Sequence, residues 1–230
     1  MEQTFSRLQY QPLLDSALPI GAFSHSFGLE TLVHDGRIRT RADLESYIRV
    51  MLMNAWAPGD CMVIKAVYEY GALGEWERVW RLDLRLHVQR AARESREGLH
   101  KMGRRLLKLG AQMYPQLQWS TLEEAVRSGH CPGTYPLVHG WISKQLGAPL
   151  QTAVEGYLYN SVLNTINSAL RLMSIGQTEG QTLLVRLLPV CSEVMRLVHE
   201  LSPEEAYTAV PQADIAMMRH ETLYSRLFMS

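Results

Sequence analysis

The residue types best suited to chemistry gather in the segment Leu18–Glu30, LPIGAFSHSFGLE, where Ser24 and Ser26 flank His25. A serine beside a histidine could work as a nucleophile with its base, and nearby glycines invite comparison with a nucleophile elbow. The elbow needs glycine two positions before and two positions after the serine, at the end of a strand. Neither serine has that spacing, and no strand-like segment precedes them. A hydrolase centre is disfavoured, and a helical enzyme using the Ser24–His25 region stays as the alternative of a different class.

Metal ligands are scattered along the chain. His130 and Cys131 form the only adjacent pair of good nickel, zinc or copper ligands, and we treat them as weak candidates because a loop cysteine beside a solvated histidine is the simpler interpretation. The three cysteines form no CxxC pair. No phosphate-binding loop or HExxH helix occurs, since His220-Glu221 is followed by Thr222-Leu223-Tyr224. We therefore predict no catalytic residue, no resident metal and no tightly bound cofactor.

The composition is that of an ordinary globular protein. The 230 residues are 47% hydrophobic and 20% charged, and 23 basic side chains balance 23 acidic ones. The balance gives no overall bias towards nucleic acid. The N-terminus lacks the features of a signal peptide, and no apolar run approaches membrane-spanning length, so we expect a cytoplasmic protein that is not bound to a membrane.

The elements that must position these groups are all helical. Apolar residues recur at helical spacing in nearly every segment, and no segment alternates with the period of a strand. We predict one compact all-α domain over residues 1–230, with about nine to ten helices. Thr40 and Asp43 mark a helix start. Pro58-Gly59-Asp60 is expected to end one helix and cap the next, and residues 86–109 are expected to form one long helix.

Two surfaces of this predicted domain need an explanation. One face of the helix over residues 86–109 is basic between Arg90 and Lys108. This pattern is typical of a solvated helix face or of a docking face for an acidic partner. Nucleic-acid binding is a third interpretation, which the small number of aromatic residues disfavours. The final residues are apolar enough that they should pack on the domain, on a second copy or on another protein.

Several motifs together resemble the urease accessory protein F (UreF) family. They begin with LPIGAFSHSFGLE and continue through Arg93-Glu94-Ser95-Arg96, Gly129-His130 and PLVHG. They then run through Tyr157 with Asn160 and ALRLMSIGQTEGQTLL, and they end in DIAMMRHETLYSRLF. The motifs span residues 14–230 in family order. The loop after His130, Cys131 to Thr134, departs from the family pattern.

The resemblance implies an all-helical homodimer without catalysis of its own, a chaperone scaffold for nickel insertion. Such a protein bridges the accessory protein UreD (UreH in some systems) and the GTPase UreG, so that nickel is handled by the complex and delivered to apo-urease. Family patterns place Arg226, Leu227 and Phe228 on the UreD side and Glu30, Arg93 and Arg96 on the GTPase side. They make Tyr157 and Phe23 contacts of the dimer or of the tail. We further hypothesise that neither Arg93 nor Arg96 reaches the nucleotide.

Overall fold

The computed structural model describes residues 5–230, and every regular element in that part of the chain is a helix. This confirms the all-α prediction. The elements are α1 (Arg7–Tyr10), η1 (Gln11–Leu14), η2 (Ala22–Ser24), α2 (Leu29–His34), α3 (Arg41–Met51), η3 (Leu52–Asp60), α4 (Cys61–Ala72), α5 (Trp76–Gln89), α6 (Arg93–Met113), α7 (Ser120–Arg127), α8 (Tyr135–Gln145), α9 (Leu150–Leu172), α10 (Gln177–Glu200), η4 (Pro203–Glu205) and α11 (Pro211–His220).

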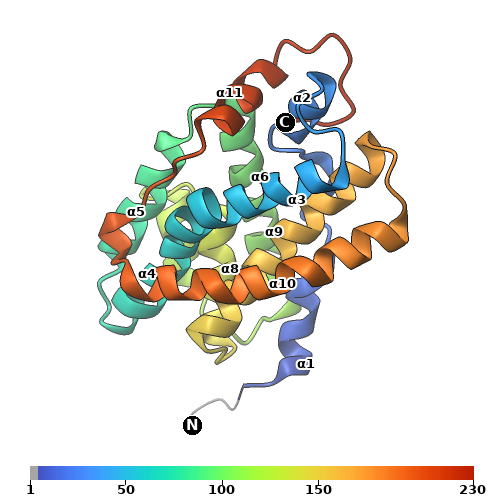
Figure 1. Cartoon of the computed structure of the whole chain (residues 1–230). Helices are drawn as coiled ribbons and strands as arrows, with labels where there is room; N and C mark the ends of the chain where they lie inside the picture. The colour runs from blue at the N-terminus through green and yellow to red at the C-terminus, as the bar shows by residue number, and fades with distance from the viewer. Residues whose placement is uncertain (1–4) are drawn as a thin grey trace.

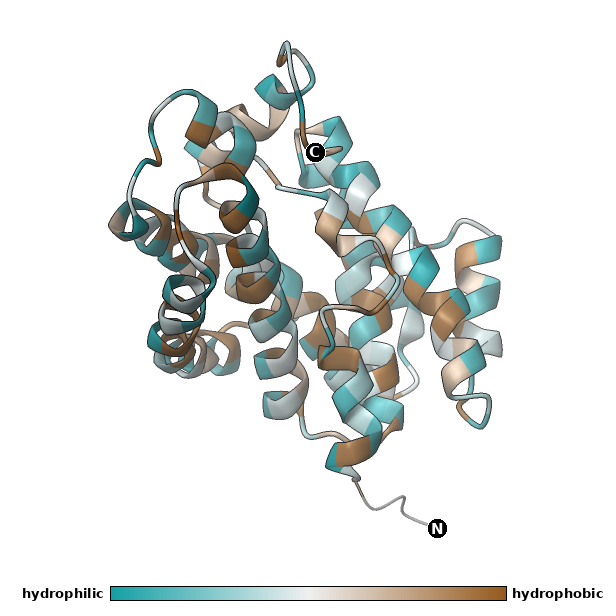
Figure 2. Cartoon of the chain, turned by 90° about the vertical axis from the view of Figure 1, so that its right-hand side faces the viewer, coloured by the Kyte–Doolittle hydropathy of each residue, from teal (hydrophilic) through white to brown (hydrophobic). Residues whose placement is uncertain are grey.

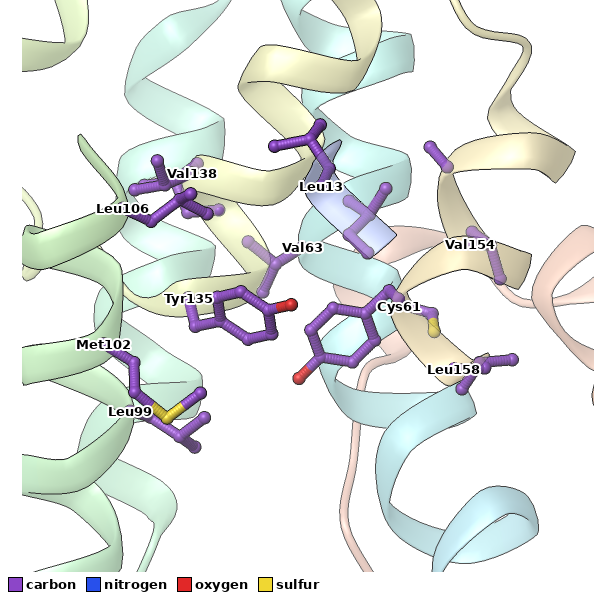
Figure 3. Close-up of a cluster of buried hydrophobic side chains, with 14 of the residues drawn as sticks. Leu13, Cys61, Val63, Leu99, Met102, Leu106, Tyr135, Val138, Val154 and Leu158 are labelled. Atoms are coloured by element: carbon purple, nitrogen blue, oxygen red, sulfur yellow. The ribbon is translucent and has the colours of Figure 1, made fainter. Parts of the chain in front are cut away.

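The core forms around α4, α8 and α9, which pack against one another and are covered by α5, α6 and α10. Residues Cys61–Val67 of α4 are buried without interruption, so this helix is central, as its apolar sequence predicts. Figure 3 shows side chains from η1, α4, α6, α8 and α9 converging, among them Leu13, Val63, Leu106, Val138 and Val154. Most outer helices carry hydrophobic and hydrophilic bands side by side (Figure 2).

The helical path does not end at Pro58-Gly59-Asp60, which corrects the predicted break. A π-helical stretch, η3, carries Pro58 inside it and runs directly into α4. Proline has no N–H, so Pro58 can donate no hydrogen bond to a carbonyl oxygen of the preceding turn. Here the Asn54 oxygen accepts instead from Ala209 N at 2.8 Å, and the Pro58 oxygen accepts from Tyr207 N at 2.9 Å. The segment leading to α11 thus satisfies the acceptors that the irregular helix frees.

The predicted long helix over residues 86–109 is two helices, α5 and α6. The backbone turns extended at Arg90, with ψ 108°, and again at Ala92, with ψ 117°. At this break Arg90 forms an ion pair with Asp60, a carboxylate only 2% exposed. A buried carboxylate without a partner would be costly, so this ion pair stabilises the non-helical backbone at Arg90.

Two glycines of α6 allow close packing, as their cost in helix propensity suggests. A Cβ on Gly103 would lie 2.0 Å from the carbonyl oxygen of Gly133, and one on Gly98 would lie 3.0 Å from the ring of His25. At Gly103 a Cβ would clash with the backbone, and at Gly98 it would require the His25 ring to shift. The glycines thus bring α6 against the start of α8 on one side and against the Leu18–Glu30 loop on the other.

The two ends of the described chain lie far apart. Helix α1 lies at the bottom of the view, whereas the C-terminal residues return beside α2 near the top (Figure 1). The helix start at Thr40 is confirmed, because Thr40 and Asp43 form a capping box. Among the helices of residues 5–230, none is long and apolar enough to cross a membrane.

Candidate partner-binding site at the C-terminal tail

The loop from Leu18 to Glu30 is shaped by left-handed backbone conformations. Gly21 has φ 85° and Gly28 has φ 89°, values at which glycine avoids the clash of a Cβ. Phe27, at φ 48°, is the non-glycine residue with positive φ in the described chain. A Cβ on Gly28 would also lie 2.9 Å from Met217 Cγ, so the loop needs this glycine to pack against α11.

The last residues of the chain dock on this loop through the backbone. The carbonyl oxygen of Ser230 accepts from Phe27 N at 3.0 Å and from Ser26 Oγ at 2.8 Å. Met229 N donates to the Ser24 carbonyl oxygen at 2.8 Å. Segments some two hundred residues apart thus lie side by side, as Figure 1 shows. We call residues 221–230 the tail.

Glu30 connects the tail to the domain. Its carboxylate accepts from Leu227 N at 2.6 Å and from Phe228 N at 3.1 Å, and it lies 2.9 Å from His220 Nε2. His220, fully buried, contacts Glu94 Oε2 through Nδ1 at 2.8 Å. The other oxygen of Glu94 accepts from Arg226 at 2.7 Å. Glu30 and Glu94, joined by His220, therefore bond the tail at three successive residues.

Phe228 anchors the tail by burial. Its ring is 5% exposed, and the Arg171 guanidinium lies 4.4 Å from the ring centroid, a cation–π contact. The Arg171 guanidinium also donates to the carbonyl oxygen of Phe23 at 3.1 Å. Leu227, Met229 and Phe23 remain exposed beside this anchor. The docked tail thus leaves an apolar rim on the surface.

The contacts of His25, the histidine of the loop, are structural and not those of a catalytic base. Burial, aided by the positive charges of Lys101 and Arg105, lowers the pKa of His25 to about 4, so the ring is neutral at pH 7. Its Nδ1 lies 2.7 Å from Ser230 Oγ, and both side chains are buried. A catalytic pair would need an accessible serine and a third group to orient the base. Among residues 5–230 no carboxylate hydrogen-bonds His25, so the geometry does not favour the hydrolase alternative.

Among the residues expected on the GTPase side, Glu30 differs from that expectation. Its side chain is buried at 6% exposure under the tail, where His220 and the N–H groups of Leu227 and Phe228 surround its carboxylate. Arg93 is exposed and pairs with Glu221 of the tail at 3.2 Å. Arg96 donates to the carbonyl oxygens of Arg90 and Ala91, where the backbone between α5 and α6 is open. Arg93 and Arg96 therefore lie on one turn of α6, next to the tail.

Tyr157 also lies elsewhere than expected. It is 2% exposed, and its hydroxyl donates to Asp60 Oδ2 at 2.7 Å. The side chain therefore completes the buried Asp60–Arg90 pair and offers no surface to the tail or to a second copy. Phe23 is 65% exposed, and its contact with a second copy or with the tail stays a prediction.

The candidate metal ligands diverge. Cys131 is buried, and burial raises the pKa of its thiol to about 12, which disfavours the thiolate that a metal would need. His130 is exposed, with its Nδ1 2.9 Å from Ser128 Oγ. No group of three or more His, Cys, Asp or Glu side chains suited to a metal ion occurs in the described part of the chain.

The basic face is smaller than the sequence suggests, because Arg90 belongs to the buried ion pair. Lys101 pairs with Glu97 at 3.4 Å on the same helix. Arg104, Arg105 and Lys108 remain exposed, and within residues 5–230 they form no ion pair. The surface that continues from the tail along α6 is therefore positively charged.

Three contributors to the site were missed by sequence reasoning: His220, Glu94 and Arg171. All three belong to the quoted motifs, but only the fold reveals their contacts, such as that of His220 with Glu94 across 126 residues. Arg171 shares one face of α9 with Asn160, Asn164 and Asn167, by their spacing along the helix. Of these, Asn160 is buried and bonds the Leu13 carbonyl oxygen and the Tyr135 hydroxyl.

The fold and the site define a class: an all-helical protein whose C-terminal tail docks beside a basic helix through hydrogen bonds and ion pairs. Comparison with known proteins makes this specific. A family model for UreF matches residues 38–188. The chain is 34% identical over 218 residues to the urease accessory protein UreF of Lachnoclostridium phytofermentans, covering 95% of this chain and 96% of that protein. It is 33% identical over 224 residues to that of Paenarthrobacter aurescens, covering 97% and 98%.

The chain therefore belongs to the UreF family of urease accessory proteins. The role of this family is that of a chaperone in nickel insertion, and membership implies participation in the maturation of urease.

Proposed function

We propose that this protein is a non-catalytic scaffold that bridges UreD (or UreH) and the GTPase UreG and promotes GTP-dependent nickel delivery to apo-urease. In this proposal it works as a cytoplasmic homodimer and carries no resident cofactor, because nickel is handled by the complex. The observation that carries the proposal is the tail itself, which leaves Leu227 and Met229 exposed and adjoins the first turn of α6.

The tail is assigned to UreD. Arg226, Leu227 and Phe228 offer a charge, an exposed apolar side chain and a buried aromatic anchor within three residues. Interfaces are commonly centred on aromatic and arginine anchors of this kind. Phe23, exposed near the Arg171–Phe228 contact, is assigned to the dimer or to the same tail surface.

The adjoining turn of α6 is assigned to UreG. Arg93 binds Glu221 of the tail, and its neighbour Glu94 binds Arg226. The surfaces for the two partners would therefore share one helical turn, so occupation of one can alter the other. A scaffold favours one nucleotide state of a GTPase only by contacting that state better.

Arg96 is assigned a structural part in this surface. Its guanidinium bonds two backbone carbonyl oxygens at the α5–α6 break. This supports the hypothesis that Arg96 does not enter the nucleotide site. Loss of GTP hydrolysis by Arg96→Ala in a complex that still assembles would contradict it.

The test is co-purification with the cognate partners from cells that express all three proteins. Removing residues 226–230 should abolish capture of UreD while circular dichroism and size-exclusion elution stay unchanged. Arg93→Ala should weaken capture of UreG and spare UreD, whereas Arg127→Ala, an exposed arginine on α7, should change neither. Unchanged capture of UreD by the truncated protein would refute the tail assignment, and turnover of a small substrate by the isolated protein would refute the scaffold.

A further inference from the structure

A pocket of about 220 Å³ lies between α5 and the short turn η4. The helix α5 itself lies away from the C-terminal end of the chain (Figure 1). Arg78, Arg81 and Arg85 line it with Tyr70, Leu82 and one carboxylate, Glu204, next to Pro203. Residues three and four apart share one face of a helix, so the sequence spacing itself aligns the three guanidinium groups. The pocket is built on a rigid helix whose opposite side packs in the core.

One of the three arginines is fully engaged. The Arg78 guanidinium pairs with Glu75 at 2.6 Å and with Glu204, and it lies 3.7 Å above the ring of Tyr70. The Tyr70 hydroxyl donates to the other oxygen of Glu204. Glu204 thus shows that the pocket can hold an oxyanion, since a carboxylate of the chain already occupies part of it.

Arg81 and Arg85 are not neutralised in the same way. Within residues 5–230 neither forms an ion pair. In the described part of the chain, the Nε of Arg85 is buried without a hydrogen-bond partner, and its Nη2 donates to the Pro203 carbonyl oxygen at 3.4 Å. Arg81 is exposed, and its Nε donates to the Glu77 carbonyl oxygen at 3.3 Å. A buried donor without an acceptor is costly, and an acceptor in the pocket would remove that cost.

We infer that this pocket is a binding site for a small doubly charged oxyanion of the phosphate class, held by Arg81 and Arg85. Two unneutralised arginines match two negative charges, and arginine suits phosphate because its planar donors bond two oxygens at once. A water molecule takes about 30 Å³ of liquid volume, so the pocket accepts a phosphate ion with some of its hydration. The occupant is a free anion, and its site is separate from the surfaces assigned above to protein partners.

The test is a calorimetric titration of the full chain with sodium phosphate at pH 7.5 and constant ionic strength, with sodium acetate as the singly charged comparison. We expect saturable phosphate binding that Arg81→Ala/Arg85→Ala weakens by about a hundredfold, tenfold for each charged hydrogen bond lost. The control Arg104→Ala/Lys108→Ala removes the same charge from α6 and should bind like the wild type. Glu204→Gln should bind several-fold more tightly, because it removes the competing carboxylate.

Other outcomes would overturn the inference. Absence of saturable binding, acetate binding as tight as phosphate, or equal loss in the α6 control would each show that the pocket is not a dianion site. Should the double variant fail to fold, Arg81→Glu decides the matter. It leaves Arg85 in place, puts a negative charge at the mouth of the pocket and should abolish phosphate binding, and retained binding refutes the assignment.

Discussion

Two glutamates hold comparable positions in two regions of this protein and behave differently. Glu30 at the tail site is buried and accepts from two backbone N–H groups while contacting His220. Glu204 at the arginine pocket is half-exposed and accepts from the Tyr70 hydroxyl and one guanidinium. Each joins distant segments. The difference shows that a buried carboxylate surrounded by donors fixes structure, whereas an exposed one among arginines leaves binding capacity nearby.

The largest effect should come from Glu30→Ala. It removes the acceptor for Leu227 N, Phe228 N and His220 at once, and we expect a loss of about 3 kcal/mol in the free energy of unfolding, since each buried donor left unpaired costs ~1–3 kcal/mol and the freed tail recovers some hydration. Urea denaturation followed by circular dichroism measures this. Glu97→Ala, an exposed carboxylate on α6, serves as the control and should stay within ~0.5 kcal/mol of the wild type. Equal values for the two variants would contradict a structural role for Glu30.

Features that depend on residues close together in the sequence are the ones that sequence analysis predicts correctly. The cap at Thr40, the burial of α4 and the need for small residues in α6 follow from local rules of helix geometry, and the structure bears them out. The apolar composition of the tail predicts packing, and Phe228 does pack on the domain. Each of these depends on neighbours along the chain, so one segment contains the needed information.

The remaining features depend on segments that meet only in the fold. From the sequence, Glu30 is expected to be an exposed acid in the first turn of a helix. No neighbouring residue indicates that its carboxylate contacts His220 and the backbone N–H groups of the tail. The sequence predicts continuous helix across the break between α5 and α6, because the partner that Arg90 meets there, Asp60, lies 30 residues away. Tyr157 reads as a motif residue for contact, yet the same buried carboxylate holds it inside. Side-chain type alone does not decide which carboxylate becomes buried.

A second difference between the regions is their response to acid. Burial lowers the pKa of His25 at the tail site from 6.5 to about 4, whereas the arginine pocket is lined by no histidine. A histidine whose pKa is depressed by folding binds protons more readily when unfolded, so stability falls as pH falls from 6.5 towards 4. His25 should therefore cost about 2 kcal/mol between pH 7 and pH 5.

The measurement compares urea unfolding of the wild type and His25→Gln at pH 7 and pH 5. The variant should lose about 2 kcal/mol less than the wild type over this interval. Subtraction is needed because burial also lowers the pKa of His87 and of His139 to about 4, and because Asp83, whose pKa burial raises to about 6, acts in the opposite direction. Identical pH dependence in the two proteins would show that His25 is protonated as readily in the folded state.

The smallest effect should come from Glu204→Ala, which tests the other half of the comparison. The variant loses an ion pair with Arg78 and a hydrogen bond from Tyr70, but both donors face a pocket that water can enter. Solvent therefore replaces the carboxylate, and the free energy of unfolding should fall by no more than ~1 kcal/mol, the usual range for an exposed pair. Urea unfolding under the conditions used for Glu30→Ala gives the direct contrast. A loss as large as that of Glu30→Ala would mean that Glu204 holds η4 in place, and the pocket would then be a structural joint whose arginines are needed for folding.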